Sequence, residues 1–202
     1  MFKRERFAAI FFRHLTWYFP QRKNEIFLTF DDGPIPDITP WVLSILKEYN
    51  AKATFFCVGQ KVQKNIALYQ QIMNEGHAVG NHSYSHLSGW KTKNQEYYKD
   101  IYKASGLIHS NLFRPPYGKI TLQQIKQLKD EYRIVMWDVL SYDYHPKITP
   151  QKCLRNVLQK ITSGSVVVFH DNQKALKNLH YTLPLVLQYF SEKGFVFKPI
   201  TD

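Results

Sequence analysis

The amino-acid sequence predicts an α/β fold with a largely parallel sheet. After residue 24, short β-branched or aromatic runs alternate with longer segments whose apolar residues recur at helical spacing. The 202 residues, 44% of them hydrophobic, are enough for one domain with a sizeable core. Because no linker, repeat or low-complexity tract divides the chain, we expect one domain of residues 25–202, with an extension of residues 1–24 packed on it.

Seven segments have the length and composition of strands that are buried in such a sheet. In chain order they are residues 25–30, 53–58, 78–80, 112–114, 133–138, 165–170 and 195–199. Parallel strands need long crossover connections, which are usually helical, so helices are expected between these segments.

The helices are predicted from capping residues and from apolar periodicity. Thr39-Pro40 and Thr149-Pro150 each place a capping threonine before a proline, which suits the first helical position. The helix after Thr149 is expected to continue toward Gly164, where glycine favours a stop. Further helices are predicted over residues 61–75, 95–112, 121–129 and 183–192.

The composition favours anionic partners but does not indicate nucleic acid. The chain has 27 Lys and Arg residues against 16 Asp and Glu residues, a formal charge of +11. The basic residues are spread along the chain and form no nucleic-acid-binding module, so no nucleic-acid partner is expected. Cys57 and Cys153 are too few for a disulfide framework, and Cys57 is expected to be a buried free thiol. The sequence does not indicate an oligomeric state.

The N-terminus resembles a truncated signal peptide. Lys3, Arg4 and Arg6 precede the short apolar segment 7–12, but Arg13 interrupts this segment and no small-residue cleavage pattern follows. We therefore interpret it as part of the mature chain, forming a helix that covers one end of the core. Alternatively, its aromatic and basic residues contact a membrane surface. No apolar run reaches the roughly 18 residues of a transmembrane helix, so a cytoplasmic or membrane-peripheral location is expected.

Two adjacent carboxylates are the most informative feature of the chain. Asp31 and Asp32 follow the apolar run 26–28 and precede a Gly33-Pro34 turn. Charged groups at the end of a buried strand are costly unless their charge is compensated, and a divalent metal commonly compensates it. Aspartate also serves as a simple cap in such turns, so this motif alone does not establish a site.

Two histidines are available as further ligands for the same ion. His82 and His86 are four residues apart, so one helical turn would direct both side chains to one point. With one aspartate they form a three-ligand set that leaves positions open for water and substrate, as a catalytic zinc site does. Parallel strands end at one edge of a sheet, so the polar residues at the predicted strand ends are expected to meet there. These residues are Asp31, Asp32, His82, Arg114, Asp138 and His170.

Five short motifs follow one another along the chain. They are Thr29-Phe30-Asp31-Asp32-Gly33-Pro34, His82-Ser83-Tyr84-Ser85-His86, Arg114-Pro115-Pro116-Tyr117-Gly118, a motif within residues 137–144, and Val168-Phe169-His170-Asp171. As a set they resemble the polysaccharide deacetylase family, which is carbohydrate esterase family 4 or the NodB homology domain. The resemblance implies a distorted (β/α) barrel with about seven mainly parallel strands. It also implies a hydrolase that uses metal-activated water to remove N-acetyl groups from an amino-sugar glycan, such as peptidoglycan, a chitin-like oligomer or a lipid-linked glycan.

The resemblance implies a metal centre and a general base. Asp32, His82 and His86 would hold one divalent ion, which is expected to be Zn²⁺, with Co²⁺, Ni²⁺ and Mn²⁺ as alternatives. Asp31 would remain off the metal and accept a proton from the attacking water. Arg114 would pair with Asp31 and orient it, because a guanidinium binds carboxylates in two-point fashion.

The resemblance also implies a general acid and an oxyanion-binding group. His170 would protonate the departing amine, which is a step that histidine can carry out near neutral pH. Asp143 would orient Arg114 or His170. The backbone amide of Tyr117 would stabilise the negative charge that develops on the acyl oxygen.

The sequence departs from the family pattern in the substrate pocket, which would include Pro116, Tyr144 and Val168. Tyr144 stands where the family usually has Trp, and Val168 where it usually has Leu. Both changes alter the shape of an acyl pocket, so the acyl group is less certain than deacylation itself. The alternatives are therefore a deformylase or an O-acetyl esterase on the same scaffold, or a non-catalytic carbohydrate-binding domain.

Overall fold

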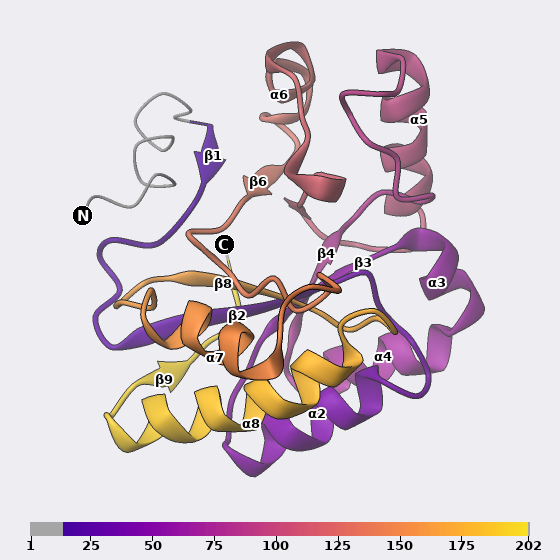
Figure 1. The fold of residues 1–202 in the computed structure, drawn as a ribbon. Helices are drawn as coiled ribbons and strands as arrows, with labels where there is room; N and C mark the ends of the chain where they lie inside the picture. The colour runs from indigo at the N-terminus through magenta and orange to yellow at the C-terminus, as the bar shows by residue number, and fades with distance from the viewer. Residues whose placement is uncertain (1–13, 202) are drawn as a thin grey trace.

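The protein folds around one curled sheet of parallel strands, which confirms the predicted fold class (Figure 1). The structure is a computed structural model that describes residues 14–201. The order of strands within these residues is β1-β6-β5-β4-β3-β2-β8-β7, and β9 pairs with β2. Every ladder between these strands is parallel.

All seven predicted strands are present, although most are shorter than expected. They are β2 (Glu25–Asp31), β3 (Thr54–Cys57), β4 (Ala78–Asn81), β5 (Leu112–Phe113), β6 (Arg133–Val135), β8 (Val166–His170) and β9 (Val196–Phe197). Two more, β1 (Leu15–Thr16) and β7 (Val139–Leu140), were not predicted. A two-residue strand has no detectable periodicity, so only pairing with a neighbour identifies it.

Each segment predicted to be helical contains a helix, but several helices begin or end at residues other than the predicted ones. They are α2 (Thr39–Glu48), α3 (Gly59–Lys64), α4 (Ile66–Asn74), α5 (Asn94–Ser105), α6 (Leu122–Leu128), α7 (Pro150–Leu158) and α8 (Leu176–Glu192). Helix α5 ends before Gly106 instead of continuing to residue 112. Helix α8 begins seven residues earlier than the predicted Leu183 and contains Pro184.

The predicted single helix over residues 61–75 is in fact two helices. Asn65 lies between α3 and α4 with non-helical dihedrals of φ −133° and ψ 49°. Its side-chain amide donates to the carbonyl oxygens of Lys61 and Pro34, at 3.0 and 3.3 Å. Asparagine side chains compete in this way with helical backbone hydrogen bonds, which explains the break. The bond to Pro34 also ties this junction to the turn that follows β2.

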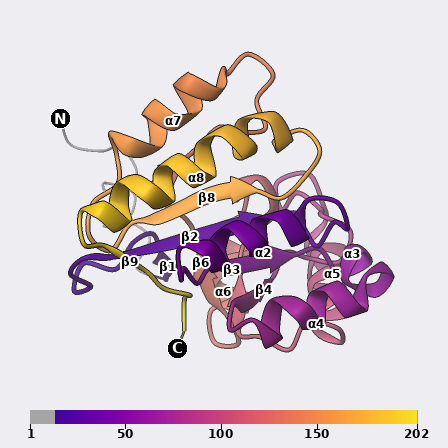
Figure 2. The same ribbon diagram turned by 90° about the horizontal axis from the view of Figure 1, so that it is seen from below.

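The main core lies between the central strands and the helices on one side of the sheet. Figures 1 and 2 show α2, α4, α7 and α8 along the same side of β2 and β8. Across three neighbouring strands, the ring of Phe30 stacks on Phe55 and Phe169, with centroids 5.1 and 6.0 Å apart. Cys57 and Cys153 are buried free thiols, as expected for Cys57. Burial of this apolar face fixes the strand register on which the site depends.

Only the second half of the predicted N-terminal extension is described. Within it, β1 pairs with β6, and the ring of Phe19 lies 4.4 Å from that of Phe27. The expected N-terminal helix and the alternative membrane contact fall partly on residues 1–13, which lie outside the described residues. The other aromatic and basic residues expected at the membrane lie in the described part of the extension, where residues 14–24 form β1 and turns and no helix; they are Trp17, Tyr18, Phe19, Arg22 and Lys23. Among residues 14–201, no helix is both long and apolar enough to cross a membrane.

Candidate active site

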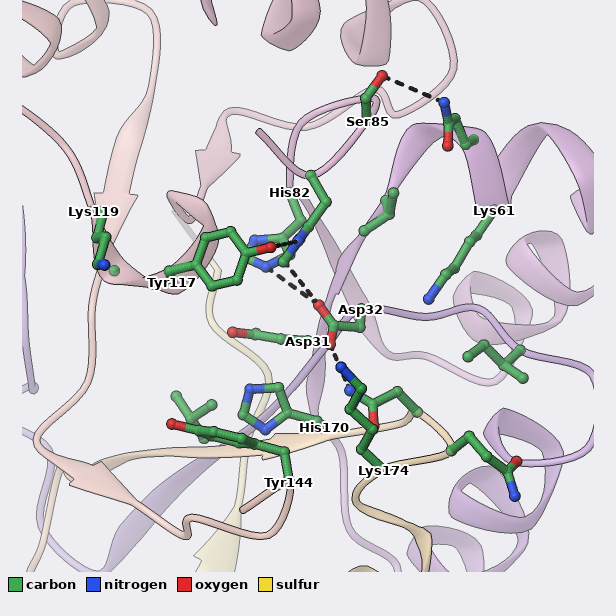
Figure 3. Close-up of a pocket in the computed structure, with 18 of the residues that line it drawn as sticks. Asp31, Asp32, Lys61, His82, Ser85, Tyr117, Lys119, Tyr144, His170 and Lys174 are labelled. Atoms are coloured by element: carbon green, nitrogen blue, oxygen red, sulfur yellow. Dashed lines mark hydrogen bonds and ion pairs between the residues drawn. The ribbon is translucent and has the colours of Figure 1, made fainter. Parts of the chain in front are cut away.

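The carboxyl ends of neighbouring parallel strands bring most of the predicted site residues together (Figure 3). Asp31 and Asp32 lie at the end of β2, His82 and His86 follow β4, Arg114 follows β5, Asp143 and Tyr144 follow β7, and His170 ends β8. In the ladder between β2 and β8, Asp31 is directly paired with His170. The expectation that polar residues gather on one edge therefore holds for these side chains.

Asp138 is the exception, because it lies at the other end of β8. Its two carboxylate oxygens accept hydrogen bonds from the backbone of Val166 at 2.9 Å and the hydroxyl of Ser165 at 3.0 Å. The expectation that Asp138 joins the site is wrong, because β6 ends at Val135 and the chain turns before Asp138. The residue instead anchors the start of β8.

The two adjacent carboxylates both reach the same pocket because the backbone leaves the strand geometry at the second of them. In a strand, successive side chains point to opposite faces. Asp32 has a φ of +84°, a left-handed conformation that is costly for a residue other than glycine. This change of backbone direction places the side chains of Asp31 and Asp32 at the same edge of the sheet. Ser83, His86 and Tyr117 near the site also have positive φ values.

The turn at Gly33 packs directly against the side-chain carboxylate of Asp171. A Cβ atom on Gly33 would lie 2.0 Å from Oδ2 of Asp171, so only glycine fits there. The hydroxyl of Thr39 donates to the same oxygen at 2.5 Å, and it accepts from the backbone of Ile35. Burial raises the pKa of Asp171 to about 7, with a further contribution from the charge of Asp32. Thr39 thus links this carboxylate to α2, instead of acting as the predicted cap.

Arg114 is fully buried and holds Asp31 in place. Its Nη1 donates to Oδ1 of Asp31 at 2.7 Å and to the hydroxyl of Thr29 at 2.6 Å. Its remaining nitrogens donate to the carbonyl oxygens of Val135 and Met136, and its guanidinium lies over the ring of Phe56. A buried guanidinium with this many partners can adopt only one orientation, so it fixes the direction of the carboxylate.

Asp32, His82 and His86 form a group whose chemistry suits a metal ion. One potential ligand atom from each residue lies within 4.8 Å of the other two. Oδ1 of Asp32 is 3.1 Å from Nε2 of His86 and 3.7 Å from Nε2 of His82. Although burial favours the neutral carboxyl, the hydrogen bond to His86 and the nearby histidines hold the pKa of Asp32 well below its usual range. The three side chains therefore present one anionic oxygen and two imidazole nitrogens to a common point.

Hydrogen bonds outside this group leave the correct imidazole nitrogens free for a metal. Nδ1 of His82 is 2.7 Å from the carbonyl oxygen of Arg114, which can only accept, so this nitrogen carries the proton. Burial lowers the pKa of His82 to about 4, so the ring is neutral and its Nε2 has a lone pair. Nδ1 of His86 is 3.1 Å from the Tyr117 hydroxyl. Such partners orient metal-binding histidines in proteins, and this set of residues fits a divalent ion.

The loop that carries the two histidines is not the predicted helical turn. Its conformation is set by Asp100 of α5, whose Oδ2 accepts from the backbone of Tyr84 at 3.0 Å and Ser85 at 2.9 Å. The side-chain oxygen of Asn81 accepts from the backbone of Ser83 at 2.8 Å. A single carboxylate 14 residues beyond the loop has no sequence signature, which is why this supporting role was missed.

Asn172 is a second residue that the sequence did not single out for the site. Its Nδ2 donates to Oδ2 of Asp32 at 2.6 Å, which occupies the carboxylate oxygen that faces away from the histidines. Its Oδ1 accepts from the backbone of Ala175 at 3.0 Å, just before α8 begins. A single amide thus connects the end of β8 to Asp32.

Asp143 contacts His170 and not Arg114, which decides between the two partners considered for it. Its Oδ1 is 2.8 Å from Nδ1 of His170, and its Oδ2 accepts from the backbone of the same residue at 2.7 Å. Burial alone would lower the pKa of His170, but the negative charge of Asp143 and its hydrogen bond raise it to about 9. His170 therefore carries a proton at neutral pH, with Nδ1 bonded to Asp143 and Nε2 free.

A pocket of about 730 Å³ opens over these residues. Tyr144 and Val168 line it as predicted, together with Trp137 and Leu140, and the Tyr144 ring meets the edge of His170 at 4.8 Å between centroids. Pro116 is buried in the short 3₁₀ turn η1 (Pro116–Gly118) and is not among the lining residues. The full lining is Asp31, Asp32, Ile35, Val58, Gln60, Lys61, His82, Ser85, His86, Tyr117, Gly118, Lys119, Trp137, Leu140, Tyr144, Val168, His170, Asn172, Gln173 and Lys174.

Comparisons with known proteins agree with this geometry. A family model described as polysaccharide deacetylase matches residues 20–133. A peptidoglycan-N-acetylglucosamine deacetylase of Bacillus cereus is 32% identical over 199 residues, which covers 94% of this chain and 92% of that protein. A chitooligosaccharide deacetylase of Azorhizobium caulinodans is 28% identical, and the match covers 89% of this chain and 94% of the relative.

A solved structure extends the similarity to three dimensions. The crystal structure of a peptidoglycan N-acetylglucosamine deacetylase in complex with 4-naphthalen-1-yl-N-oxidanyl-benzamide superposes with a TM-score of 0.84 at 32% identity. The superposition covers 96% of this chain and 94% of that chain. The similarity therefore includes nearly all of the fold and not only the motifs.

Proposed function

Because this chain belongs to the polysaccharide deacetylase family, we propose that it hydrolyses the N-acetyl groups of an amino-sugar glycan. The observation that carries the proposal is a division of labour on one edge of the sheet. Three side chains suited to a metal lie beside a separate carboxylate fixed by a buried arginine and a separate protonated histidine. Amide hydrolysis needs these three elements: an activated water, a base and an acid. The proposed catalytic unit is residues 25–202.

Asp32, His82 and His86 would hold the divalent ion, for which Zn²⁺ is the expected identity. A bound ion of this kind makes a coordinated water more acidic and withdraws electron density from an acyl oxygen. While the ion is bound, Asn172 would orient Asp32 and Tyr117 would orient His86.

Asp31 would act as the general base. It is adjacent in the chain to the proposed metal ligand Asp32, yet its Oδ1 is held by Arg114 and it is not part of the ligand group. It lines the same pocket, so its free oxygen can accept the proton of the water that attacks the acyl carbon. Arg114 acts through Asp31 as a positioning residue.

His170 would act as the general acid. An amine leaves the tetrahedral intermediate readily only if its nitrogen is protonated. Nδ1 of His170 is hydrogen-bonded to Asp143, so its Nε2–H, in the pocket, is the group that can give a proton to this nitrogen. The backbone amide of Tyr117 would stabilise the oxyanion, and the apolar wall of Trp137, Leu140, Tyr144 and Val168 would receive the acyl methyl group.

The replacement Asp143→Asn is expected to move the alkaline limb of the pH profile to lower pH. Activity needs protonated His170, and so it falls as pH rises through the pKa of His170. An amide at position 143 removes the negative charge that raises this pKa, while the burial that lowers it remains. The measurement is kcat/KM against pH for wild type and variant.

An Asp130→Asn variant provides the control, because Asp130 carries the same charge and its side chain is 79% exposed. A purely structural role for Asp143 would lower activity by a similar factor at every pH. An unshifted alkaline limb in Asp143→Asn would therefore contradict the assignment of His170 as the acid.

The substrate proposed is the N-acetylglucosamine of a peptidoglycan-type glycan, supported by the name and coverage of the Bacillus cereus relative. The test is to incubate the metal-loaded protein with acetylated and formylated amino-sugar oligomers and with O-acetylated glycans. Free amine and acetate released together from an N-acetylated oligomer would support the proposal. Formate release would identify a deformylase, acetate without amine an O-acetyl esterase, and glycan binding without any release a non-catalytic domain.

A further inference from the structure

The long helix α8 holds the loop that carries Asp143. This loop, called here the Asp143 loop, is residues 141–149 between β7 and α7, and α7 lies beside α8 (Figures 1 and 2). In the first turn of α8, Nδ2 of Asn178 donates to the carbonyl oxygen of Asp143 at 2.7 Å and to that of Ile148 at 3.2 Å. One amide group therefore binds the Asp143 loop at two points, near its beginning and near its end.

The two carbonyl oxygens explain why an asparagine suits this position. A carbonyl oxygen can only accept, and the asparagine amide has two N–H donors on a short side chain, so it can satisfy both at once. Asn178 is 6% exposed, so water cannot readily replace these bonds if they are lost. An aspartate of the same shape would present only acceptors to the two carbonyl oxygens, and a leucine would present no polar group.

Asn178 joins the Asp143 loop to the part of the fold that carries His170. Two further bonds of Asp143 lie within the loop itself: its N–H donates to Oγ of Ser141 at 3.2 Å, and its Oδ1 accepts from the backbone of Tyr144 at 3.0 Å. Bonds of this kind move with the loop. Helix α8 instead follows β8, which ends at His170, so a bond to α8 holds the backbone of Asp143 in a fixed position relative to His170.

We propose that Asn178 is a positioning residue for deacetylation, which acts through Asp143 by holding the Asp143 loop against α8. Without its amide, the backbone of Asp143 can shift relative to β8, and the imidazole of His170 loses the fixed partner that directs its Nε2–H into the pocket. Asn178 is not among the residues that line the pocket, so it acts on the proton donor and not on the glycan. This inference rests on the proposed deacetylase function and adds a residue to it.

The first test is the replacement Asn178→Leu, which removes both donors and keeps the side chain close to its original size. In the metal-loaded full chain, kcat on an N-acetylated glycan should fall by roughly tenfold, while KM stays within about twofold, because the proton donor is displaced and the glycan contacts are not. An unchanged kcat in a folded Asn178→Leu protein would overturn the proposal. If this variant does not fold, Asn178→Ser takes its place; it keeps one hydroxyl donor and should show part of the loss.

A double-mutant cycle with Asp143→Asn shows whether Asn178 acts through Asp143. Once the carboxylate that orients His170 is gone, holding its backbone in place brings no further benefit. Asn178→Leu should therefore lower kcat by less than about twofold in the Asp143→Asn background, although it lowers kcat by roughly tenfold in wild type. Two losses that simply multiply would mean that Asn178 acts by another route, and they would contradict the proposal.

Val186 provides a control for loss of stability on the same helix. It is fully buried in the main core, and Val186→Ala removes apolar contacts of α8 without changing the amide of Asn178. Its melting temperature should fall, while its kcat, measured well below that temperature, should remain that of wild type. A tenfold fall of kcat in Val186→Ala as well would attribute the effect of Asn178→Leu to a weakened α8 and would refute a positioning role.

Failure of this inference can be distinguished from failure of the proposed function. If wild type deacetylates the glycan and Asn178→Leu does so equally well, the enzyme is a deacetylase and the positioning role is wrong. If wild type is inactive, the proposed function fails, and amide hydrogen exchange decides the structural part separately. Exchange in residues 141–149 should be faster in Asn178→Leu than in wild type and Val186→Ala, and exchange in residues 82–86 should not change. Equal exchange of the Asp143 loop in all three proteins would refute its attachment through Asn178.

Discussion

The replacement Asp31→Asn is expected to lower kcat by roughly 10³-fold and to leave metal content unchanged. An amide cannot accept the proton of the attacking water, so the base is lost. Its oxygen can still accept the hydrogen bond from Nη1 of Arg114, now 2.7 Å from Oδ1 of Asp31. The metal group of Asp32, His82 and His86 does not include Asp31 and should remain intact. The measurements are kcat on the N-acetylated glycan and metal content per chain.

The same variant has a predictable effect on stability. Arg114 is fully buried and would lose its negatively charged partner, so the free energy of unfolding should fall by about 2 kcal/mol. Denaturant unfolding of Asp31→Asn and of the exposed control Asp130→Asn separates this loss from the catalytic one. A folded, metal-replete Asp31→Asn protein with the wild-type rate would show that another group is the base.

The neighbouring replacement Asp32→Asn is also expected to be inactive, but for a different reason: the protein no longer binds the metal. A neutral amide is a weaker metal ligand than a carboxylate. Its NH₂ group could also donate a hydrogen bond to Nε2 of His86 or His82 and so occupy the lone pair that the ion needs. Affinity for Zn²⁺ should fall by more than about 100-fold, and turnover should fall with metal occupancy. The direct measurement is metal affinity by competition with a chromophoric chelator.

Thermal unfolding provides a readout of the metal site without any activity assay. Because a ligand that binds only the folded state stabilises it, free Zn²⁺ at 100 times its Kd should add about 2.7 kcal/mol to wild type. The melting temperature of Asp32→Asn should not respond to the same concentration, whereas Asp31→Asn should respond like wild type. Equal responses of the two variants would contradict the separate roles assigned to the adjacent carboxylates.

Much of the fold could be predicted because its signals are local. Apolar runs identified β2, β3 and β8, and Thr149 with Pro150 identified the start of α7, whose cap the structure contains. The prediction failed where tertiary contacts decide. Strands β1 and β7 exist only through pairing with β6 and β8, and the break at Asn65 depends on a bond to Pro34.

The candidate site shows the same boundary between local and distant information. The motifs contained the side chains that line the edge of the sheet. Their meeting there could be predicted, because the carboxyl ends of parallel strands lie at one edge. They could not reveal that Asp138 lies at the far end of β8, or that Asp143 contacts His170 and not Arg114. Such choices depend on where a loop turns, which one or two residues do not encode.

By itself, the sequence determined the kind of fold, the family resemblance and the set of candidate residues: the order of motifs along the chain is local information. Only the tertiary structure decided how those residues divide their work. Asp31 and Asp32 are chemically identical neighbours, and they differ because the left-handed backbone at Asp32 directs one toward two histidines while the other meets a buried arginine. Their surroundings come from β4, β5 and β8, so no property of the dipeptide could distinguish them.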